Sequence, residues 1–260
     1  MKRTLIQPEL SAFPERFRPL LANAKVYDSS CSQDARVWFL DTEGGLYLKT
    51  APAGKLETEA KMTAYFHSKG LGAEVLAYHR DSRDWLLTRA IPGEDCTFPA
   101  YLEDPKRLSE TLGILLRRLH SVDISDCPID RTASYIAGAR NMYKSGYYDT
   151  SLYPDNWGYH CAEDAWNVME ENAHLLKRDV LLHGDYCLPN VMLDNWKFSG
   201  FIDVGNGGIG DRHIDLFWGV WTLGFNLKTD AYGDRFLDAY GREDVEEEML
   251  PIIGAFECFG

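Results

Sequence analysis

The chain has 260 residues, enough for one large or two small domains with a sizeable core. Its formal net charge of −13 is unevenly distributed: residues 1–92 carry 13 basic and 11 acidic side chains, whereas residues 93–260 carry 14 and 29. Such an acidic second part argues against nucleic acid as a partner. It is consistent either with a surface that serves solubility or with an acidic cleft that concentrates a cationic substrate.

The sequence shows no signal for secretion or membrane insertion. Two prolines and two glutamates interrupt any apolar run within the first twenty residues, and the longest uncharged stretch, 216–227, is too short to span a bilayer. No two cysteines have the spacing of metal ligands, so we expect reduced thiols in a cytoplasmic protein without a membrane partner. The six are Cys31, Cys96, Cys127, Cys161, Cys187 and Cys258.

Residues 1–92 have the pattern of a small lobe rich in strands. An amphipathic helix is predicted over 55–69 and ends at Gly70, a residue suited to a helix C-terminus. Proline and glycine in 91–95 break the pattern and predict a hinge to the next lobe. Four apolar runs predict strands, the first two joined by the turn sequence DTEGG, and they occupy 35–40, 45–50, 74–79 and 84–89.

Residues 93–260 predict a larger lobe that is helical except around one motif. Asp104 precedes a proline and an apolar stripe that continues to His120, which predicts an amphipathic helix. The stretch 145–159, rich in Gly, Tyr, Asp and Pro, predicts an irregular exposed loop. Further helices are expected at about 131–144, 160–177, 211–225, 229–240 and 243–257.

The most informative feature is the motif HGDYCLPN, which begins at His183, together with GFIDVGNGGIGD further on. Asn190 follows Asp185 by five residues, and Asp203 follows Asp185 by eighteen, beyond two short strands at 191–194 and 198–203. One carboxylate beside an amide oxygen and a second carboxylate is what phosphoryl transfer requires. Asn190 and Asp203 would hold Mg²⁺ on nucleotide phosphates, while Asp185 would accept or orient the attacking hydroxyl.

The small lobe contains a candidate phosphate-binding pair. Glu59 lies on the packing face of the predicted helix, where a carboxylate is costly unless it is paired, and Lys49 at the end of the second strand is its expected partner. Tyr47 shares the strand face of Lys49, where its ring either stacks on a base or packs in the core. Ser32, in the polar turn 28–34, is either a phosphate ligand or an ordinary turn residue.

Together these residues resemble the aminoglycoside phosphotransferases, in particular the 3′-phosphotransferase branch. The resemblance also covers LRRLHSVDISDCP, which begins at Leu116, and GFIDVGNGGIGDRHID, which begins at Gly200. It implies an α+β, bilobal protein-kinase-like fold with a small antiparallel-sheet lobe at 1–92, which binds nucleotide, and a larger, mainly helical catalytic lobe at 93–260. It also implies Mg²⁺, and ATP or GTP between the lobes.

The resemblance assigns roles by position. Lys49 and Glu59 correspond to the phosphate-binding pair, and Asp185 to the catalytic carboxylate. Asp211 and Asp215 are expected to be structural: Asp211 would cap the next helix and brace the catalytic loop, and His183 would bond backbone near Asp203. The segment that reads the base corresponds to Thr88, Arg89, Ala90 and Ile91, with Tyr47 stacking on the base, and the metal ligands to Asn190 and Asp203.

The acceptor side departs from the branch pattern. An arginine typical of the branch is replaced by Asn206, two acids expected in the next helix are Phe225 and Asn226, and another expected acid is Phe256. Because carboxylates bind a polyamine through charge-assisted contacts, these losses weaken the match to typical aminoglycosides. The remaining candidate acceptor residues are Asp155, Glu163, Asp164, Asn206 and Glu257, with Phe259 packing on a sugar ring.

The sequence thus predicts an enzyme that transfers the γ-phosphoryl group of ATP or GTP to a hydroxyl of a cationic small molecule, an aminoglycoside at its 3′-hydroxyl being the leading acceptor. One alternative is a metabolite kinase of the same fold, with aromatic rings caging a choline-like acceptor. A second is a non-catalytic nucleotide-binding protein. The candidate cage residues are Tyr147, Tyr148, Tyr153, Trp157, Trp218 and Trp221.

Overall fold

The computed structural model describes residues 3–30, 35–149 and 159–260. It divides into two compact units, one formed by Met1–Cys96 with Pro189–Gly205 and the other by Thr97–Leu188 with Asn206–Gly260. The sequence placed a single boundary after residue 92. The observed division differs because Pro189–Gly205 contributes strands that pair with the end of the first segment, so that the first unit is built from two pieces of chain.

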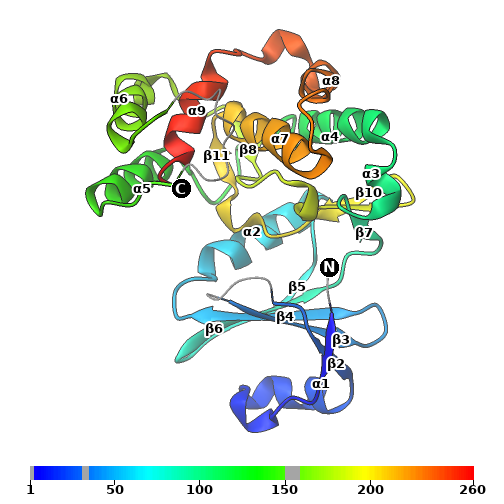
Figure 1. Cartoon of the computed structure of the whole chain (residues 1–260). Coiled ribbons are helices and arrows are strands. Elements are labelled where there is room, and N and C mark those ends of the chain that lie inside the picture. Colours follow the sequence, from blue (N-terminus) through cyan, green and yellow to red (C-terminus); the bar gives the residue numbers. More distant parts are fainter. Residues whose placement is uncertain (1–2, 31–34, 150–158) are drawn as a thin grey trace. The chain divides into compact units, whose positions relative to one another are not determined.

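The first unit is built on an antiparallel sheet of six strands in the order β1-β2-β3-β4-β6-β5 (Figure 1). Its central hairpin joins the two runs that flank DTEGG, in a register that pairs Phe39 with Tyr47 and Val37 with Lys49. The four predicted strands are present. The strands are β1 (Thr4–Ile6), β2 (Lys25–Asp28), β3 (Arg36–Asp41), β4 (Leu46–Pro52), β5 (Val75–Arg80) and β6 (Arg83–Arg89).

The two faces of this sheet have different partners. Period-two alternation directs Leu48 to one face and Lys49 to the other. On the Leu48 face, side chains from α1 (Arg18–Ala22) and the preceding 3-10 turns bury Phe13 and Phe17 against the sheet. On the other face α2 (Glu57–Ser68) packs through apolar side chains that include Ala60 and the preceding N-cap residue Leu56. Lys49 therefore lies on the same face as the helix that carries Glu59.

A second small sheet completes the first unit. It has the order β10-β9-β7, with β7 (Glu94–Asp95), β9 (Val191–Asp194) and β10 (Lys197–Phe201) all antiparallel. Residues 91–95 were expected only to interrupt the pattern, yet Glu94 and Asp95 pair with Leu193 and Met192. This pairing holds the β9–β10 hairpin, which Asn190 precedes and Asp203 follows, within the first unit.

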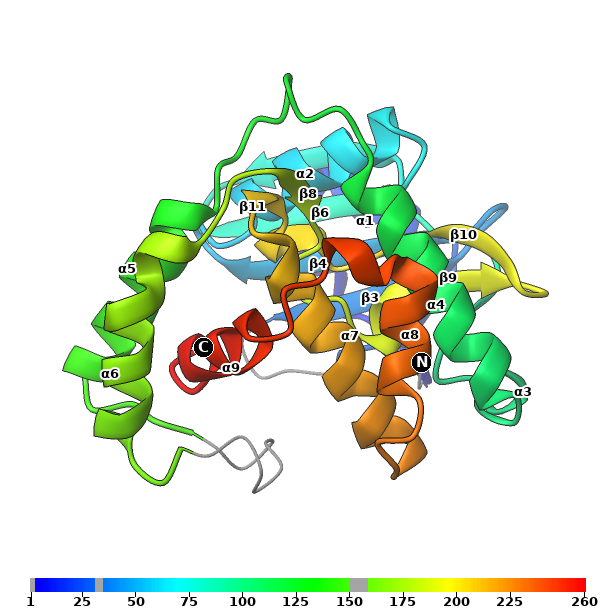
Figure 2. The same ribbon diagram turned by 90° about the horizontal axis from the view of Figure 1, so that it is seen from above.

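The second unit is mainly helical, as predicted, and Figures 1 and 2 both show α4 alongside α8 and α5 alongside α6. In α4, the side chain of Asp104 accepts the Arg107 N–H and caps the N-terminus, and a stripe of buried leucines follows. The helices are α3 (Pro99–Leu102), α4 (Pro105–His120), α5 (Thr132–Lys144), α6 (Ala162–Asn172), α7 (Arg212–Leu227), α8 (Gly233–Tyr240) and α9 (Met249–Glu257).

The predicted helix at 243–257 is wrong in its first half. A 3-10 turn at Arg242–Asp244 ends at Val245, whose extended backbone (φ −104°, ψ 115°) stops the helix, and α9 begins only at Met249. The acidic run between them has no apolar periodicity to bury, whereas α9 is apolar on most sides. No helix in the described ranges is long and apolar enough to cross a membrane.

The segment that precedes the HGD motif is a short strand, β8 (Val180–Leu182), which is completely buried. It pairs antiparallel with β11 (Gly208–Gly210), a strand that the sequence did not predict because a Gly-Ile-Gly run has no strand periodicity. A parallel bridge from Asp130 to Ile209 attaches the chain before α5 to the other side of β11. This small sheet therefore holds three site-bearing segments in register within the second unit.

Candidate active site

Lys49 is held by two carboxylates within the first unit. Its Nζ lies 2.8 and 2.9 Å from the two oxygens of Glu59 and 3.0 Å from Oδ1 of Asp203. The pairing of Lys49 with Glu59 predicted from the sequence is therefore confirmed. Gly205 packs directly on Glu59, because a Cβ at this glycine would lie 3.3 Å from the Glu59 Cβ. The chain that follows Asp203 therefore packs against the Lys49–Glu59 ion pair.

The three groups shift one another's ionisation. Burial acts to lower the pKa of Lys49, but the neighbouring charges of Asp203 and Glu59 outweigh it and raise that pKa. The pKa of Glu59 is raised, chiefly by burial and with a contribution from Asp203, against the opposing effect of Lys49. Lys49 is consequently a fixed positive charge at neutral pH, beside an Asp203 side chain that is 56% exposed.

Asn190 and Asp203 are linked through the backbone. The Ile202 N–H donates to the Asn190 carbonyl at 3.0 Å, which ties the residue before Asp203 to Asn190. Asp203 has a positive φ of 55°, in the left-handed region that Asp and Asn tolerate better than other non-glycine residues. A carboxylate and an amide oxygen are hard ligands that suit Mg²⁺, which usually keeps water and phosphate oxygens as its other ligands. The donor set fits that ion.

The described part of the chain has no cluster of three or more His, Cys, Asp or Glu side chains that could hold a metal ion. A site of the type that Asn190 and Asp203 offer contains only one such side chain. The Asn190–Asp203 pair therefore differs from a site in which the protein supplies every metal ligand. A nucleotide would have to complete the coordination of the metal.

Tyr47 and the predicted base-reading segment are partly engaged with the protein itself. The Tyr47 hydroxyl accepts a hydrogen bond from Arg3 at 2.7 Å, and its ring lies 5.2 Å from that of Phe39. The Arg89 N–H donates to Glu74, and the Ala90 N–H donates to Gly45. Two of the amides in this segment are therefore committed to holding the sheet.

The other two residues of the segment whose backbone was predicted to read the base are Thr88 and Ile91. Ile91 packs on Gly200, where an added Cβ would lie 2.6 Å from Ile91 Cδ1. Thr88 pairs with Tyr47 in the sheet and is half-buried. Thr88 and Tyr47 thus lie side by side on neighbouring strands, whereas Ile91 supports the second small sheet. Ser32 lies outside the described residues.

The HGD loop of the second unit is held by a buried aspartate. Asp215 is fully buried, and its two oxygens accept the N–H groups of His183 at 2.7 Å and Gly184 at 2.8 Å. The His183 ring in turn accepts the Asp185 N–H through Nδ1 at 3.3 Å. The sequence assigned the bracing of this loop to Asp211, and that expectation is wrong: Asp215 performs it.

Asp211 has the capping role that the sequence predicted. Its side chain accepts the His213 N–H at 2.9 Å at the start of α7 and the Lys177 N–H at 2.7 Å. It also bonds His213 Nδ1 at 2.7 Å, while the Glu246 N–H donates to the other ring nitrogen at 3.0 Å. Hydrogen bonds from His213 and Lys177 lower the pKa of Asp211 despite its burial.

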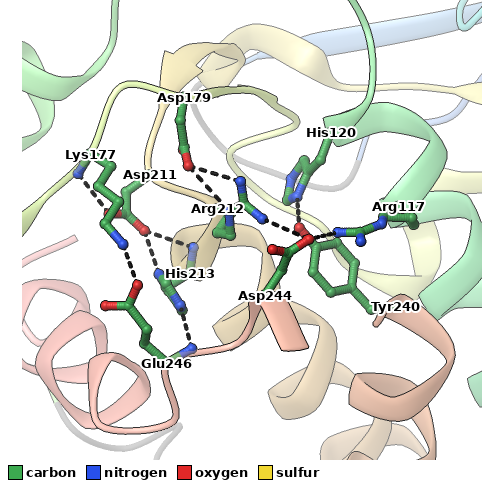
Figure 3. A network of polar contacts seen from close by, with 10 residues as sticks. All are labelled: Arg117, His120, Lys177, Asp179, Asp211, Arg212, His213, Tyr240, Asp244 and Glu246. Atoms are coloured by element: carbon green, nitrogen blue, oxygen red, sulfur yellow. Dashed lines mark hydrogen bonds and ion pairs between the residues drawn. The ribbon is translucent and has the colours of Figure 1, made fainter. Parts of the chain in front are cut away.

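A network of polar side chains lies around Asp211 and extends to His120, Tyr240 and Arg212 (Figure 3). His120, at the end of α4, contacts Asp215 through Nε2 at 3.1 Å and Tyr240 through Nδ1 at 2.9 Å. Burial lowers the pKa of His120, so the ring is neutral and donates to the carboxylate. Arg212 links Asp179 at 2.9 Å to Asp244 at 3.5 Å. The sequence did not identify His120, because only tertiary packing brings it to Asp215.

Glu257 is the strongest candidate acceptor residue among the described acids. It lies at the end of α9, accepts a hydrogen bond from the Tyr135 hydroxyl at 2.7 Å, and is half-buried. Burial raises its pKa to about 7, and the charges of Asp185 and Asp215 contribute to that rise. A carboxylate that senses the charge of Asp185 is well placed to meet a group presented to the HGD loop.

The other acceptor candidates are less concentrated. Glu163 and Asp164 are exposed in the first turn of α6, where Asp164 accepts the His160 N–H at 3.3 Å. Asn206 accepts a hydrogen bond from Arg131 at 3.4 Å. The expectation that Phe259 packs on a sugar is wrong, because this residue is 1% exposed and its ring is in the core between Tyr143 and Tyr148. Asp155, Tyr153 and Trp157 lie outside the described residues.

Aromatic side chains form a series along α7. The rings of Trp218 and Trp221 lie 5.3 Å apart, and that of Trp221 stacks on Phe225 at 4.9 Å. Phe225 is 48% exposed, and Trp218 acts to lower the pKa of Glu257. The series therefore leads from the surface of the second unit towards the half-buried Glu257.

Comparison with known proteins identifies the family of the chain. A profile of the phosphotransferase enzyme family matches residues 28–252. The chain is 47% identical over 255 residues to a probable aminoglycoside 3′-phosphotransferase of Lactococcus lactis subsp. lactis (strain IL1403), covering 96% of each chain. It is also 27% identical over 210 residues to the aminoglycoside 3′-phosphotransferase of Niallia circulans, covering 78% of this chain and 79% of that one.

Solved structures show the same fold. The aminoglycoside-3′-phosphotransferase of type VIII superposes with a TM-score of 0.77 at 26% identity, covering 95% of this chain and all of the other. The aminoglycoside phosphotransferase APH(3'')-Id from Streptomyces rimosus has a TM-score of 0.73 at 23% identity, covering 97% and 99%. The predicted α+β, kinase-like fold is thereby confirmed, and the chain belongs to the aminoglycoside phosphotransferase family of phosphotransferase enzymes.

Proposed function

We propose that this enzyme transfers the γ-phosphoryl group of ATP or GTP to a hydroxyl of a cationic small molecule, with the 3′-hydroxyl of an aminoglycoside as the leading acceptor. The observation that carries the chemistry is the position of Lys49 Nζ between Glu59 and Asp203. A fixed cation beside a metal-binding carboxylate is the arrangement that phosphate recognition requires. The acceptor class is supported by the 47% identity to the Lactococcus protein.

Each polar residue then has a defined task. Lys49 binds nucleotide phosphate oxygens, and Glu59 fixes the direction of its ammonium. Asn190 and Asp203 would hold Mg²⁺, which when bound neutralises charge on the phosphates. Asp185 orients the acceptor hydroxyl and takes its proton as the new O–P bond forms. No covalent intermediate on the protein is needed, because the acceptor oxygen attacks the γ-phosphorus directly.

Acceptor binding is assigned to the second unit. Glu257 would receive an amine of the acceptor, because an ionised carboxylate in a half-buried position binds a cation more strongly than a fully solvated one. Glu163, Asp164 and Asn206 are weaker candidates. We place the reaction in the cytoplasm, since the cysteines of the described segments are free thiols.

A kinase for another hydroxylated amine is the second candidate. The series formed by Trp218, Trp221 and Phe225 favours it, because aromatic faces bind apolar ring surfaces and quaternary ammonium groups without requiring carboxylates. This function also accounts for the replacement of several expected acids in the chain.

A nucleotide-release assay tests both functions. Purified enzyme is given ATP or GTP with kanamycin, neomycin, choline, and a panel of sugars and amino alcohols. Asp185→Ala serves as the blank and Asp194→Ala, an exposed residue bonded to its neighbour Asn195, as the matched surface control. Turnover of kanamycin that is lost only in Asp185→Ala supports the aminoglycoside function. Turnover of choline or an amino alcohol, without kanamycin turnover, transfers the assignment to the second candidate.

A further inference from the structure

Arg131 is a partly buried arginine for which the described residues supply no carboxylate partner. Its side chain donates a hydrogen bond from Nη2 to the neutral Oδ1 of Asn206 at 3.4 Å. The adjacent Asp130 is instead paired with Arg178. Burial lowers the pKa of Arg131, and no acidic neighbour offsets that effect, although the guanidinium stays protonated at neutral pH. A buried, uncompensated cation is costly to the fold.

The position of this side chain is tightly fixed. The Arg131 N–H donates to the carbonyl of Ile209 in β11, and the Ile209 N–H donates to Ile129, both at 2.8 Å. Gly208, with a φ of 145°, lies directly beneath the arginine: an added Cβ would be 2.6 Å from Arg131 Cγ. The glycine is therefore required both by its backbone conformation and by the close approach of the arginine stem.

The same contacts bring Arg131 close to the HGD loop within the second unit. Its partner Asn206 packs against Gly184, where an added Cβ would lie 2.1 Å from the Asn206 carbonyl oxygen. Asp185 is the next residue in the loop. Arg131 therefore bonds a residue, Asn206, that packs on Gly184, and Gly184 directly precedes Asp185.

The chemistry of the neighbourhood determines what this cation binds. A cationic acceptor would be repelled by a guanidinium, so Arg131 does not serve the amines of an aminoglycoside. The anion that the proposed reaction brings to Asp185 is the phosphoryl group in transfer, whose charge is spread over three equatorial oxygens. The guanidinium of Arg131 lies against Asn206, three residues after Asp203.

We propose that Arg131 is a catalytic residue that binds the transferred phosphoryl group, an inference that rests on the proposed function. In the step, the bond from the γ-phosphorus to its bridging oxygen breaks while the bond to the acceptor oxygen forms. The hydroxyl proton passes to Asp185. Arg131 keeps all its protons and donates hydrogen bonds to an equatorial oxygen, which stabilises charge without entering the proton balance.

The test compares Arg131→Ala with Arg178→Ala, which removes an exposed arginine that contacts the neighbouring Asp130. Arg131→Ala should lower kcat by about 10²- to 10³-fold, the cost of removing one preorganised donor, with KM for both substrates little changed. Added guanidinium, at concentrations that leave the fold intact, should restore part of the rate in Arg131→Ala alone. The Tm of Arg131→Ala should not fall, because no ion pair is lost. A fall in Tm without rescue would overturn the inference in favour of a structural role.

A binding measurement decides the question independently of the acceptor. ADP with aluminium fluoride imitates the phosphoryl group in transfer, and calorimetry should show that Arg131→Ala loses affinity for it relative to ADP alone, while Arg178→Ala does not. Equal affinity in the wild type and Arg131→Ala would overturn the inference. If the wild type phosphorylates none of the acceptors, the proposed acceptor class fails, and the affinity comparison still decides whether Arg131 binds the phosphoryl group.

Discussion

Asp215 holds the backbone of Gly184: its Oδ1 accepts the Gly184 N–H at 2.8 Å, while its other oxygen accepts that of His183. The carboxylate is in the first turn of α7 and is completely buried. A residue thirty-one positions away in the sequence thus sets the direction in which the HGD loop presents Asp185. The loop has no regular secondary structure, so these side-chain contacts replace a hydrogen-bond ladder.

Asp215→Asn should reduce both stability and turnover. An asparagine directs an NH₂ group at one of the two backbone donors, which leaves that donor unsatisfied at a cost of about 2–3 kcal/mol in the free energy of unfolding. Displacement of Asp185 by a fraction of an ångström should lower kcat roughly 10- to 100-fold. Denaturant unfolding and steady-state kinetics measure the two effects. Asp211→Asn is the control, expected to lose stability but to keep a kcat close to that of the wild type. Equal kcat values in both variants would contradict the bracing role.

The contrast between Asp211 and Asp215 shows where sequence reasoning stops. Asp211 is recognisable as a helix cap because capping is local and depends on residues two or three positions away. The bonds of Asp215 to His183 and Gly184 depend on how α7 packs against β8, which no local pattern encodes. The same holds for His120, whose contact to Asp215 joins residues 95 positions apart.

Lys49→Ala should destabilise the first unit as well as abolish turnover. Removing the ammonium leaves Glu59 with no counter-ion, at about 2 kcal/mol, less than the cost for a fully buried pair because the Lys49 side chain is 20% exposed. The raised pKa of Glu59 means that the loss should be larger above that pKa, where the carboxylate is ionised, than below it. Thermal unfolding at several pH values measures this.

The double variant Lys49→Met with Glu59→Gln separates stability from chemistry. Both charges are removed together, so the Tm should recover towards that of the wild type while turnover stays absent. A double variant that remained as unstable as Lys49→Ala would show that the ion pair is not the source of the destabilisation.

The Lys49–Glu59 pair was predictable, because a lysine at a strand end and a carboxylate on the packing face of the next helix require one another. The longer hairpins and amphipathic helices followed from periodicity in the same way. The strands β1, β7 and β11 did not, since two or three residues are too few to show a period. Arg131 was not predicted for a further reason: its partner Asn206 lies 75 residues away, and no chemical rule links the two types.

Asp203→Asn should remove the effect of Mg²⁺ on nucleotide affinity. Asparagine is chosen because it tolerates the positive φ of 55° at this position better than alanine, so the backbone should be preserved. Calorimetric titration of nucleotide with and without Mg²⁺ should give a clear difference in the wild type and in Asp194→Ala, but little difference in Asp203→Asn. A full Mg²⁺ effect in Asp203→Asn would remove Asp203 from the proposed ligands.

Glu257 predicts a pH dependence whose sign follows from its environment. Burial raises its pKa from 4.5 to about 7, so between these values the folded chain retains a proton that the unfolded chain has released. This contribution to stability is therefore fully present below pH 4.5 and is lost as the pH rises through about 7. The total change is on the order of 3 kcal/mol. Glu257→Gln, which imitates the protonated acid, should lack it, so the variant should gain stability relative to the wild type as the pH increases.

The same titration should appear in acceptor binding. If ionised Glu257 receives an acceptor amine, KM for the acceptor should fall in the wild type as the pH rises through about 7, because the carboxylate acquires its charge there. Amines of the acceptor lose protons over the same range, but they do so equally for Glu257→Gln. The ratio of the two KM values therefore isolates the protein group. A ratio that grows with pH supports contact between Glu257 and a cation, whereas a constant ratio would confine Glu257 to its hydrogen bond with Tyr135 and a role in packing.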